Sequence, residues 1–193
     1  MRNLFVLTLV AAMAASGTLN AEEATKGKKL KSGPQKGDTI GAFYVTKVAG
    51  AEDDGVEEGK NLCYRCRNGS RPQVIVFARS ASPKVANLVK ELDKAVDENE
   101  SSNLRVFVNI LGDDKESAHD VAKKFATSSE TKNIPFVVPN EFESGPDNYG
   151  INPNAELTVV MAVDKGVKAN VAVRKADKLN VDNVMKNLGK ILN

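Results

Sequence analysis

The sequence is poor in the residues from which metal sites and histidine-dependent active sites are built. It has no tryptophan, two cysteines and a single histidine, His119, and aromatic residues make up 5% of its 193 residues. One histidine and two thiols exclude most ways of building a zinc site or a histidine-activated nucleophile within one chain. Two cysteines are also too few for a disulfide scaffold, so the hydrophobic core must supply most of the stability. We therefore expect no metal ion and no cofactor.

Long hydrophobic runs and a strong net charge are absent as well. The apolar run from Leu4 to Ala15 is too short to span a bilayer. With Arg2 before it and small polar residues after it, the run is typical of a secretory signal peptide, cleaved after Ala21 or, alternatively, after Gly17. The formal net charge of +2 does not indicate a nucleic-acid partner. We expect an exported protein, periplasmic or extracellular, without an integral membrane span.

Composition divides the chain into three parts. Residues 1–21 form the predicted signal peptide. Residues 22–36 are rich in lysine and small polar residues with almost no apolar content, which predicts a flexible basic linker. Apolar runs alternate with polar loops over residues 37–193, and a mature chain of about 170 residues is the size of one domain with a sizeable core. We therefore expect a single domain over residues 37–193.

Hydrophobic periodicity predicts strands that alternate with helices. The β-branched run QVIVFA at 73–78 is typical of a strand covered on both faces. Ser82 and Pro83 then begin a helix whose apolar residues recur at helical spacing as far as Val96. The final pair of strands is joined by the hairpin sequence DKG. The other predicted strands are 43–48, 104–111, 134–138, 157–163 and 167–173, and the other predicted helices are 115–126 and 181–192.

This order of elements predicts an α/β fold with a central mixed sheet flanked by helices, ending in an antiparallel hairpin and a terminal helix. The order resembles the thioredoxin fold. Three stretches resemble its exported thioredoxin-like and peroxiredoxin-like branch, of the alkyl hydroperoxide reductase/thiol-specific antioxidant type. They are GDTIGAFYVTKVAG at 37–50, PQVIVFARSASPKVANLVKELDKAV at 72–96 and NYGINPNAELTVVMAVDKGVKANVAV at 148–173. The resemblance implies a thioredoxin-like domain and thiol-based redox chemistry with a protein partner.

The residues that carry this chemistry in the family are replaced here. The family's reactive cysteine follows the strand that VIVFA matches, at the start of a helix whose dipole stabilises a thiolate. This chain has no thiol there, so Ser80 and Ser82 mark a degenerate family site. The family's cis-proline is replaced by Leu157, where we expect a trans peptide bond. We therefore expect no peroxidase activity at this position.

The two cysteines form a CxxC motif, Cys63-Tyr64-Arg65-Cys66, which precedes the strand at 73–78. Two cysteines in an exported protein are expected to form an intramolecular disulfide. If the motif stays at the amino end of this strand, it lies about 20 Å from the usual family site, unless the loop folds back over the sheet. The motif is then a redox-active pair whose thiolate Arg65 and Arg67 stabilise, a static clip, or a zinc site shared across a dimer.

Two functions follow from these observations. In the first, Cys63 and Cys66 cycle between dithiol and disulfide, and one cysteine attacks a disulfide of a partner protein while the other resolves the mixed disulfide. In the second, the chain is a non-catalytic thioredoxin-like binding module and the CxxC motif is a structural disulfide. The sequence leaves the partner and the oligomeric state open.

Overall fold

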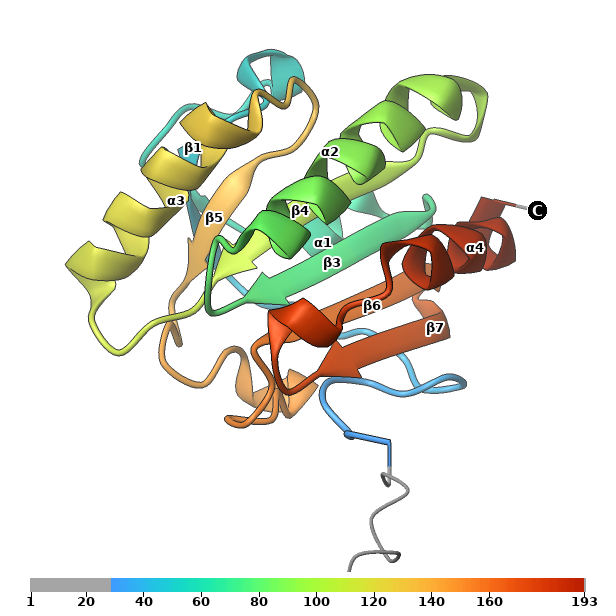
Figure 1. The fold of residues 1–193 in the computed structure, drawn as a ribbon. Coiled ribbons are helices and arrows are strands. Elements are labelled where there is room, and N and C mark those ends of the chain that lie inside the picture. Colours follow the sequence, from blue (N-terminus) through green and yellow to red (C-terminus); the bar gives the residue numbers. More distant parts are fainter. Residues whose placement is uncertain (1–28, 193) are drawn as a thin grey trace, which may run out of the picture.

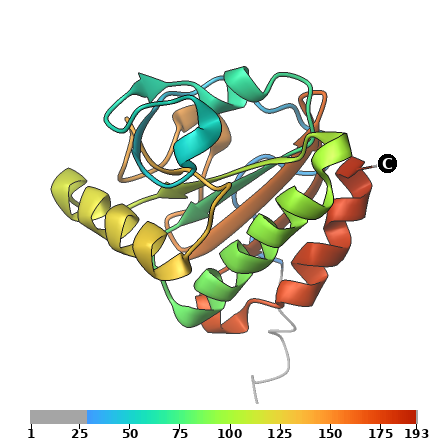
Figure 2. The same cartoon turned by 90° about the horizontal axis from the view of Figure 1, so that it is seen from above.

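A seven-stranded mixed sheet forms the centre of the computed structural model, which describes residues 29–192 (Figure 1). The strand order is β2-β1-β5-β4-β3-β6-β7. Helices α2, α3 and α4 cover one face, and the short helix α1 lies on the other (Figure 2). The strands are β1 (Val45–Ala49), β2 (Asn61–Leu62), β3 (Gln73–Ala78), β4 (Arg105–Ile110), β5 (Phe136–Pro139), β6 (Leu157–Val163) and β7 (Gly166–Val173). The α-helices are α1 (Tyr64–Asn68), α2 (Pro83–Glu98), α3 (Lys115–Ser129) and α4 (Val181–Leu192), and the 3-10 helices are η1 (Glu52–Asp54), η2 (Glu100–Ser102), η3 (Asp147–Tyr149) and η4 (Ala176–Lys178).

Strand β3 lies in the middle of the sheet and is buried along its whole length. It pairs in parallel with β4, from Gln73 opposite Arg105 to Ala78 opposite Ile110, and antiparallel with β6. Its alternate residues enter two different hydrophobic clusters, which explains its nearly continuous apolar sequence. The predicted doubly covered strand is confirmed.

The larger cluster lies under α2, α3 and α4. Val74, Val76 and Ala78 of β3 meet the buried face of α2, which begins at Pro83 as predicted. Helix α3 extends to Ser129, beyond the predicted end at residue 126, and stops where Glu130 adopts a left-handed conformation with φ of 53°. The predicted flanking helices are therefore confirmed, with one boundary moved.

The hairpin between β6 and β7 turns at Asp164 and Lys165. Both residues have positive φ, 48° and 67°. A two-residue hairpin turn whose twist matches that of the strands requires this conformation at both positions. The predicted C-terminal antiparallel hairpin, the terminal helix and the mixed α/β sheet are all confirmed.

Three features differ from the sequence expectation. Strand β2 and helix α1 were not predicted, and β2 occupies the sheet edge, so β1 is an internal strand. Ser32 and Pro34, within the predicted linker, are buried, and Ser32 Oγ hydrogen-bonds Thr158 Oγ1. The packed region thus begins by Ser32. The predicted signal peptide and the linker up to residue 28 lie outside the described residues. None of the helices described is long and apolar enough to cross a membrane.

Candidate functional site around the Cys63–Cys66 disulfide

The two cysteines are joined by a disulfide that closes the first turn of α1. Cys63 is the N-cap residue, and its Sγ accepts a hydrogen bond of 3.1 Å from the backbone N–H of Cys66. Residues three apart lie on the same side of a helix, so a CxxC spacing suits a bridge within one helical turn. Gly69 ends the helix with φ of 63°, a conformation that glycine adopts without strain.

The two sulfur-bearing residues differ in accessibility. Cys63 is buried, with 8% of its surface exposed, whereas Cys66 is exposed. Helix α1 buries Tyr64, Arg65 and Asn68 against the sheet and turns Cys66 and Arg67 to solvent. An incoming thiol therefore meets Cys66 first.

A buried lysine holds α1 in place through the acidic loop. Lys47 is 2% exposed, and its Nζ donates to Asp54 Oδ1 at 2.8 Å and to the carbonyl oxygens of Ala51 and Val56. The Tyr64 hydroxyl donates to Asp54 Oδ2 at 2.6 Å, and its ring stacks on Phe107 at 5.7 Å between centroids. Burial and the Asp54 contact raise the pKa of Tyr64 far above its usual value, so the hydroxyl stays protonated and keeps donating.

Arg65 and Arg67, the two arginines expected to stabilise a thiolate, lie in different environments. Arg65 is 8% exposed, and its Nε has no hydrogen-bond partner among residues 29–192. Its charge acts on Tyr149, where it opposes the rise in the pKa of that hydroxyl that burial causes. Arg67 is exposed, and its Nη2 donates to the carbonyl oxygen of Asp54 at 2.8 Å.

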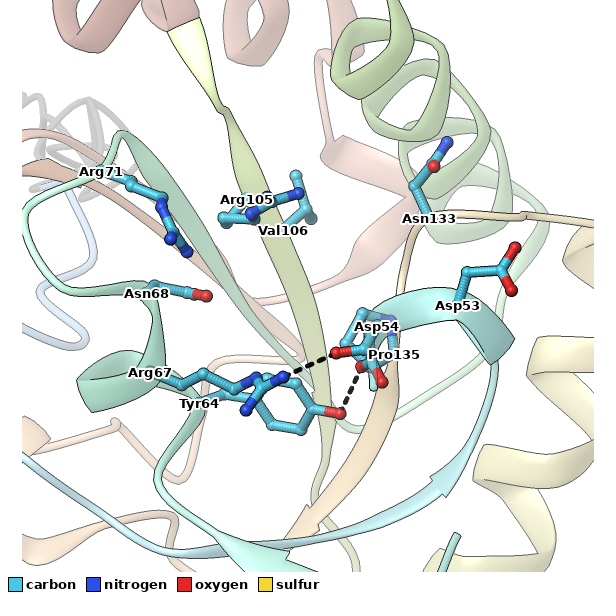
Figure 3. Close-up of a pocket in the computed structure, with 10 residues that line it drawn as sticks. All are labelled: Asp53, Asp54, Tyr64, Arg67, Asn68, Arg71, Arg105, Val106, Asn133 and Pro135. Atoms are coloured by element: carbon cyan, nitrogen blue, oxygen red, sulfur yellow. Dashed lines mark hydrogen bonds between the residues drawn. The ribbon is translucent and has the colours of Figure 1, made fainter. Parts of the chain in front are cut away.

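A polar hollow of about 430 Å³ lies beside α1, where β3, β4 and β5 begin (Figure 3). Helix α1 contributes Tyr64, Arg67 and Asn68 to its lining. The segments at the starts of the three strands contribute Arg71, Arg105 and Asn133. Asp53 and Asp54 of η1 complete the lining together with Val106 and Pro135.

The segment after β3 that contains Ser80 and Ser82 is held in part by internal hydrogen bonds. The Ser80 hydroxyl donates to Glu156 Oε1, and Glu156 Oε2 accepts the backbone N–H of Ala176 at 2.8 Å. Ser82 is the N-cap of α2, but its side chain makes no cap hydrogen bond. Leu157 is buried opposite Ala78, and no cis peptide bond occurs in the described part of the chain, as expected at Leu157.

The CxxC helix and the family position lie on opposite faces of the sheet. Tyr64 of α1 packs in the cluster of Ile75, Phe77 and Phe107, whereas α2, which follows Ser82, packs in the other cluster. Figure 2 shows α1 and the loop before it on the side away from the three long helices. The segment before β3 thus folds back over the sheet on the face opposite to α2.

Comparison with solved structures identifies the architecture. The chain is similar to a Chlorobium tepidum protein described as a thiol:disulfide interchange protein, DsbE, at 14% identity and a TM-score of 0.58 over 82% of this chain and 99% of that one. It is similar to Mycobacterium tuberculosis AhpC at 16% identity and a TM-score of 0.60, over 83% and 99% of the two chains. The peroxidoxin BcpB of the same organism matches at 14% identity and a TM-score of 0.56, over 81% and 96%.

The chain has the thioredoxin-like fold. The resemblance seen in the sequence is thereby confirmed at the level of fold. No protein-family model and no curated protein sequence matches the chain. Residues 29–192 contain no group of three or more histidine, cysteine, aspartate or glutamate side chains arranged to hold a metal ion.

Sequence reasoning missed several residues of this candidate site. Lys47 falls two residues after Val45, so strand alternation places it on the buried face, but nothing in the sequence marked Asp54 as its partner. Arg105 begins the buried strand β4, and a charged residue at the start of an apolar run was the one available signal. That Arg105 lies beside α1 depends on strand order, which the sequence pattern does not specify.

Proposed function

We propose that this protein is an exported thiol/disulfide exchange protein in which Cys63 and Cys66 cycle between dithiol and disulfide. The main observation that supports this proposal is the disulfide itself, which joins an exposed Cys66 to a buried Cys63 on a thioredoxin-like domain. Export is supported by the signal-peptide pattern of residues 1–21, and it accords with the expected disulfide. The DsbE description of one structural neighbour is consistent with this chemistry.

The difference in accessibility gives the exchange a direction. A partner thiolate attacks the Sγ of the exposed residue Cys66, the Cys63–Cys66 bond breaks, and the electron pair of that bond passes to Cys63 as a thiolate. The second partner thiol, after losing its proton, attacks the partner sulfur of the mixed disulfide and releases Cys66. The partner dithiol is thereby oxidised to a disulfide, and the Cys63–Cys66 pair is reduced by the same two electrons.

Two groups favour the Cys63 thiolate in this scheme. The backbone N–H of Cys66 already donates to Cys63 Sγ in the oxidised protein, and a hydrogen bond to an ionised acceptor is stronger than one to a neutral acceptor. Arg65, buried in the same helix without a partner for its Nε, supplies positive charge. Arg67 is exposed and donates to the Asp54 carbonyl oxygen, so we assign it a smaller part than Arg65 in stabilising the Cys63 thiolate.

Single-cysteine variants test the proposal. We expect Cys63→Ser, which leaves the exposed Cys66 thiol, to trap partner proteins as mixed disulfides, and Cys66→Ser to trap far fewer. The reduction potential of the wild-type pair provides the second measurement. A value well below about −300 mV, with no trapping by either variant, would show that the disulfide is inert.

A non-catalytic binding module is the second candidate. It is favoured by the loss of a thiol at the family position, where Ser80 is bonded to Glu156, and by the anchoring of α1 through Asp54 and Lys47. Partner binding that is the same in the wild type and in a Cys63→Ser/Cys66→Ser double variant would support the module. Binding that requires a free thiol would support exchange.

A further inference from the structure

The hollow beside α1 gathers side chains from segments that are distant in the sequence. Asn68 comes from α1, Arg71 from the turn before β3, Arg105 from the start of β4 and Asn133 from the loop before β5. Because β3 pairs in parallel with β4, and β4 with β5, the amino-terminal ends of these three strands lie side by side at one end of the sheet. Figure 3 shows Asn68, Arg67 and Arg71 along one side of the hollow and Asn133 and Asp53 along the other.

The arginines of this hollow are not neutralised by its acidic residues. Asp54 is already satisfied by Lys47, the Tyr64 hydroxyl and the backbone N–H of Val56, and the exposed Asp53 forms no ion pair with any residue that the structure describes. Within residues 29–192, neither Arg71 nor Arg105 takes part in an ion pair. The hollow therefore presents two guanidinium groups that are free to meet an anion from outside.

Asn68 adds a side-chain amide to the lining of the hollow. It is 6% exposed, and its side-chain amide makes no hydrogen bond to any part of the chain that the structure describes. The side chain points from α1 into the hollow (Figure 3). Its amide atoms are not among the enclosed polar atoms of the described chain, so they are open to the solvent in the hollow and can hydrogen-bond an external group.

We propose that this hollow binds an acidic peptide segment. Arg71 and Arg105 take a carboxylate, because a guanidinium presents paired N–H donors that match its two oxygens. Asn68 bonds the peptide backbone, since a side-chain amide offers the donor and the acceptor that a peptide group requires, whereas the Asn133 amide already donates to Asp97 Oδ1 at 2.9 Å. A nucleotide fits less well, because the apolar lining is confined to Val106, Pro135 and the Tyr64 ring, which already stacks on Phe107.

This inference does not depend on thiol exchange. Tyr64, Arg67 and Asn68 line the hollow, whereas Cys63 and Cys66 do not. A bound acidic segment would nonetheless lie against the same helix whose exposed side carries Cys66.

The test is an NMR titration of the full ¹⁵N-labelled mature protein with two short peptides. One peptide is acetyl-Glu-Glu-Gly-Glu-amide, and the other has every Glu replaced by Gln. We expect the acidic peptide alone to shift the amide signals of residues 67–71, Arg105 and Asn133. We expect Arg71→Gln/Arg105→Gln to weaken that binding by at least about tenfold, since each lost contact is a charge-assisted hydrogen bond.

Matched controls separate the site from general charge. Arg174→Gln removes an exposed arginine just after β7 and should leave binding unchanged. If the double variant misfolds, the single variants Arg71→Gln and Arg105→Gln are titrated instead, and each should bind the acidic peptide more weakly than the wild type. The Cys63→Ser/Cys66→Ser variant should bind the peptide as the wild type does, whatever the outcome for exchange. The proposal is overturned if the acidic peptide shifts none of these signals, if the Gln peptide binds equally, if the arginine variants bind as the wild type, or if inorganic phosphate binds as tightly.

Discussion

The two regions that flank β3 have opposite characters. After β3, Ser80 is bonded to Glu156 and Glu156 to the backbone of Ala176, while the enclosed Ser82 Oγ and Arg79 Nε have no partner among residues 29–192. Before β3, α1 presents an exposed Cys66 beside a hollow lined by three arginines, none of which forms an ion pair within residues 29–192. The comparison teaches that, within a thioredoxin-like fold, the cysteine pair of this chain lies on the face of the sheet opposite to α2.

The largest expected effect is on the anchoring of α1. Lys47→Met should lower the free energy of unfolding by about 3 kcal/mol, because it leaves the Asp54 carboxylate partly buried without its cation. Chemical denaturation measures this change. Lys60 is exposed and directly precedes β2, so Lys60→Met should change the free energy of unfolding by no more than about 0.5 kcal/mol. A loss below about 1 kcal/mol for Lys47→Met would mean that the loop does not hold the helix.

Removal of the disulfide should have a smaller effect. Cys63→Ala/Cys66→Ala should lower the free energy of unfolding by about 2 kcal/mol, because a bridge between residues three apart constrains little of the unfolded chain. The denaturation midpoint of the variant is compared with those of the oxidised and reduced wild type. A loss of about 4 kcal/mol or more would favour the static clip over the exchange site.

Ser80→Ala tests the other region. The variant loses the hydrogen bond to the Glu156 carboxylate and should be destabilised by about 1.5 kcal/mol, the usual contribution of a hydrogen bond to a charged group. Its rate of reduction by a small thiol should equal that of the wild type, because Ser80 lies across the sheet from Cys66. Ser101→Ala, at an exposed position, is the control for stability. A changed reduction rate in Ser80→Ala would show that the region after β3 influences the disulfide, so that the two regions act as one site.

The smallest expected effect is a pH dependence at α3, outside both regions. Burial, followed by Lys115 and Lys123, lowers the pKa of His119, while Asp120 opposes the shift. A lowered pKa means that the unfolded chain binds the proton more readily, so this contribution to stability is present above about pH 6.5 and is lost as the pH falls through the folded-state pKa. His119→Gln should therefore lose less stability between neutral and acidic pH than the wild type. Equal acid sensitivity in denaturation curves would contradict this assignment.

Much of the fold could be predicted because it depends on local pattern. The buried run of β3, the Ser82-Pro83 start of α2 and the hairpin at Asp164 and Lys165 each follow from residue type and spacing within a few positions. Helix α1 was missed because five residues are too short for a periodic pattern. The two-residue β2 was missed for the same reason, and with it the true edge of the sheet.

The candidate site could be predicted only in part. The sequence alone determined the CxxC pair, the absence of a thiol between Arg79 and Pro83, and the arginines next to the cysteines, since these are matters of residue identity. Only the tertiary structure decided that Cys66 is exposed and Cys63 buried, that Lys47 meets Asp54, and that Arg71 and Arg105 lie beside α1. The physical reason is that accessibility and charge pairing depend on strand order and on which face of the sheet a segment crosses, and both are set by contacts between residues far apart in the chain.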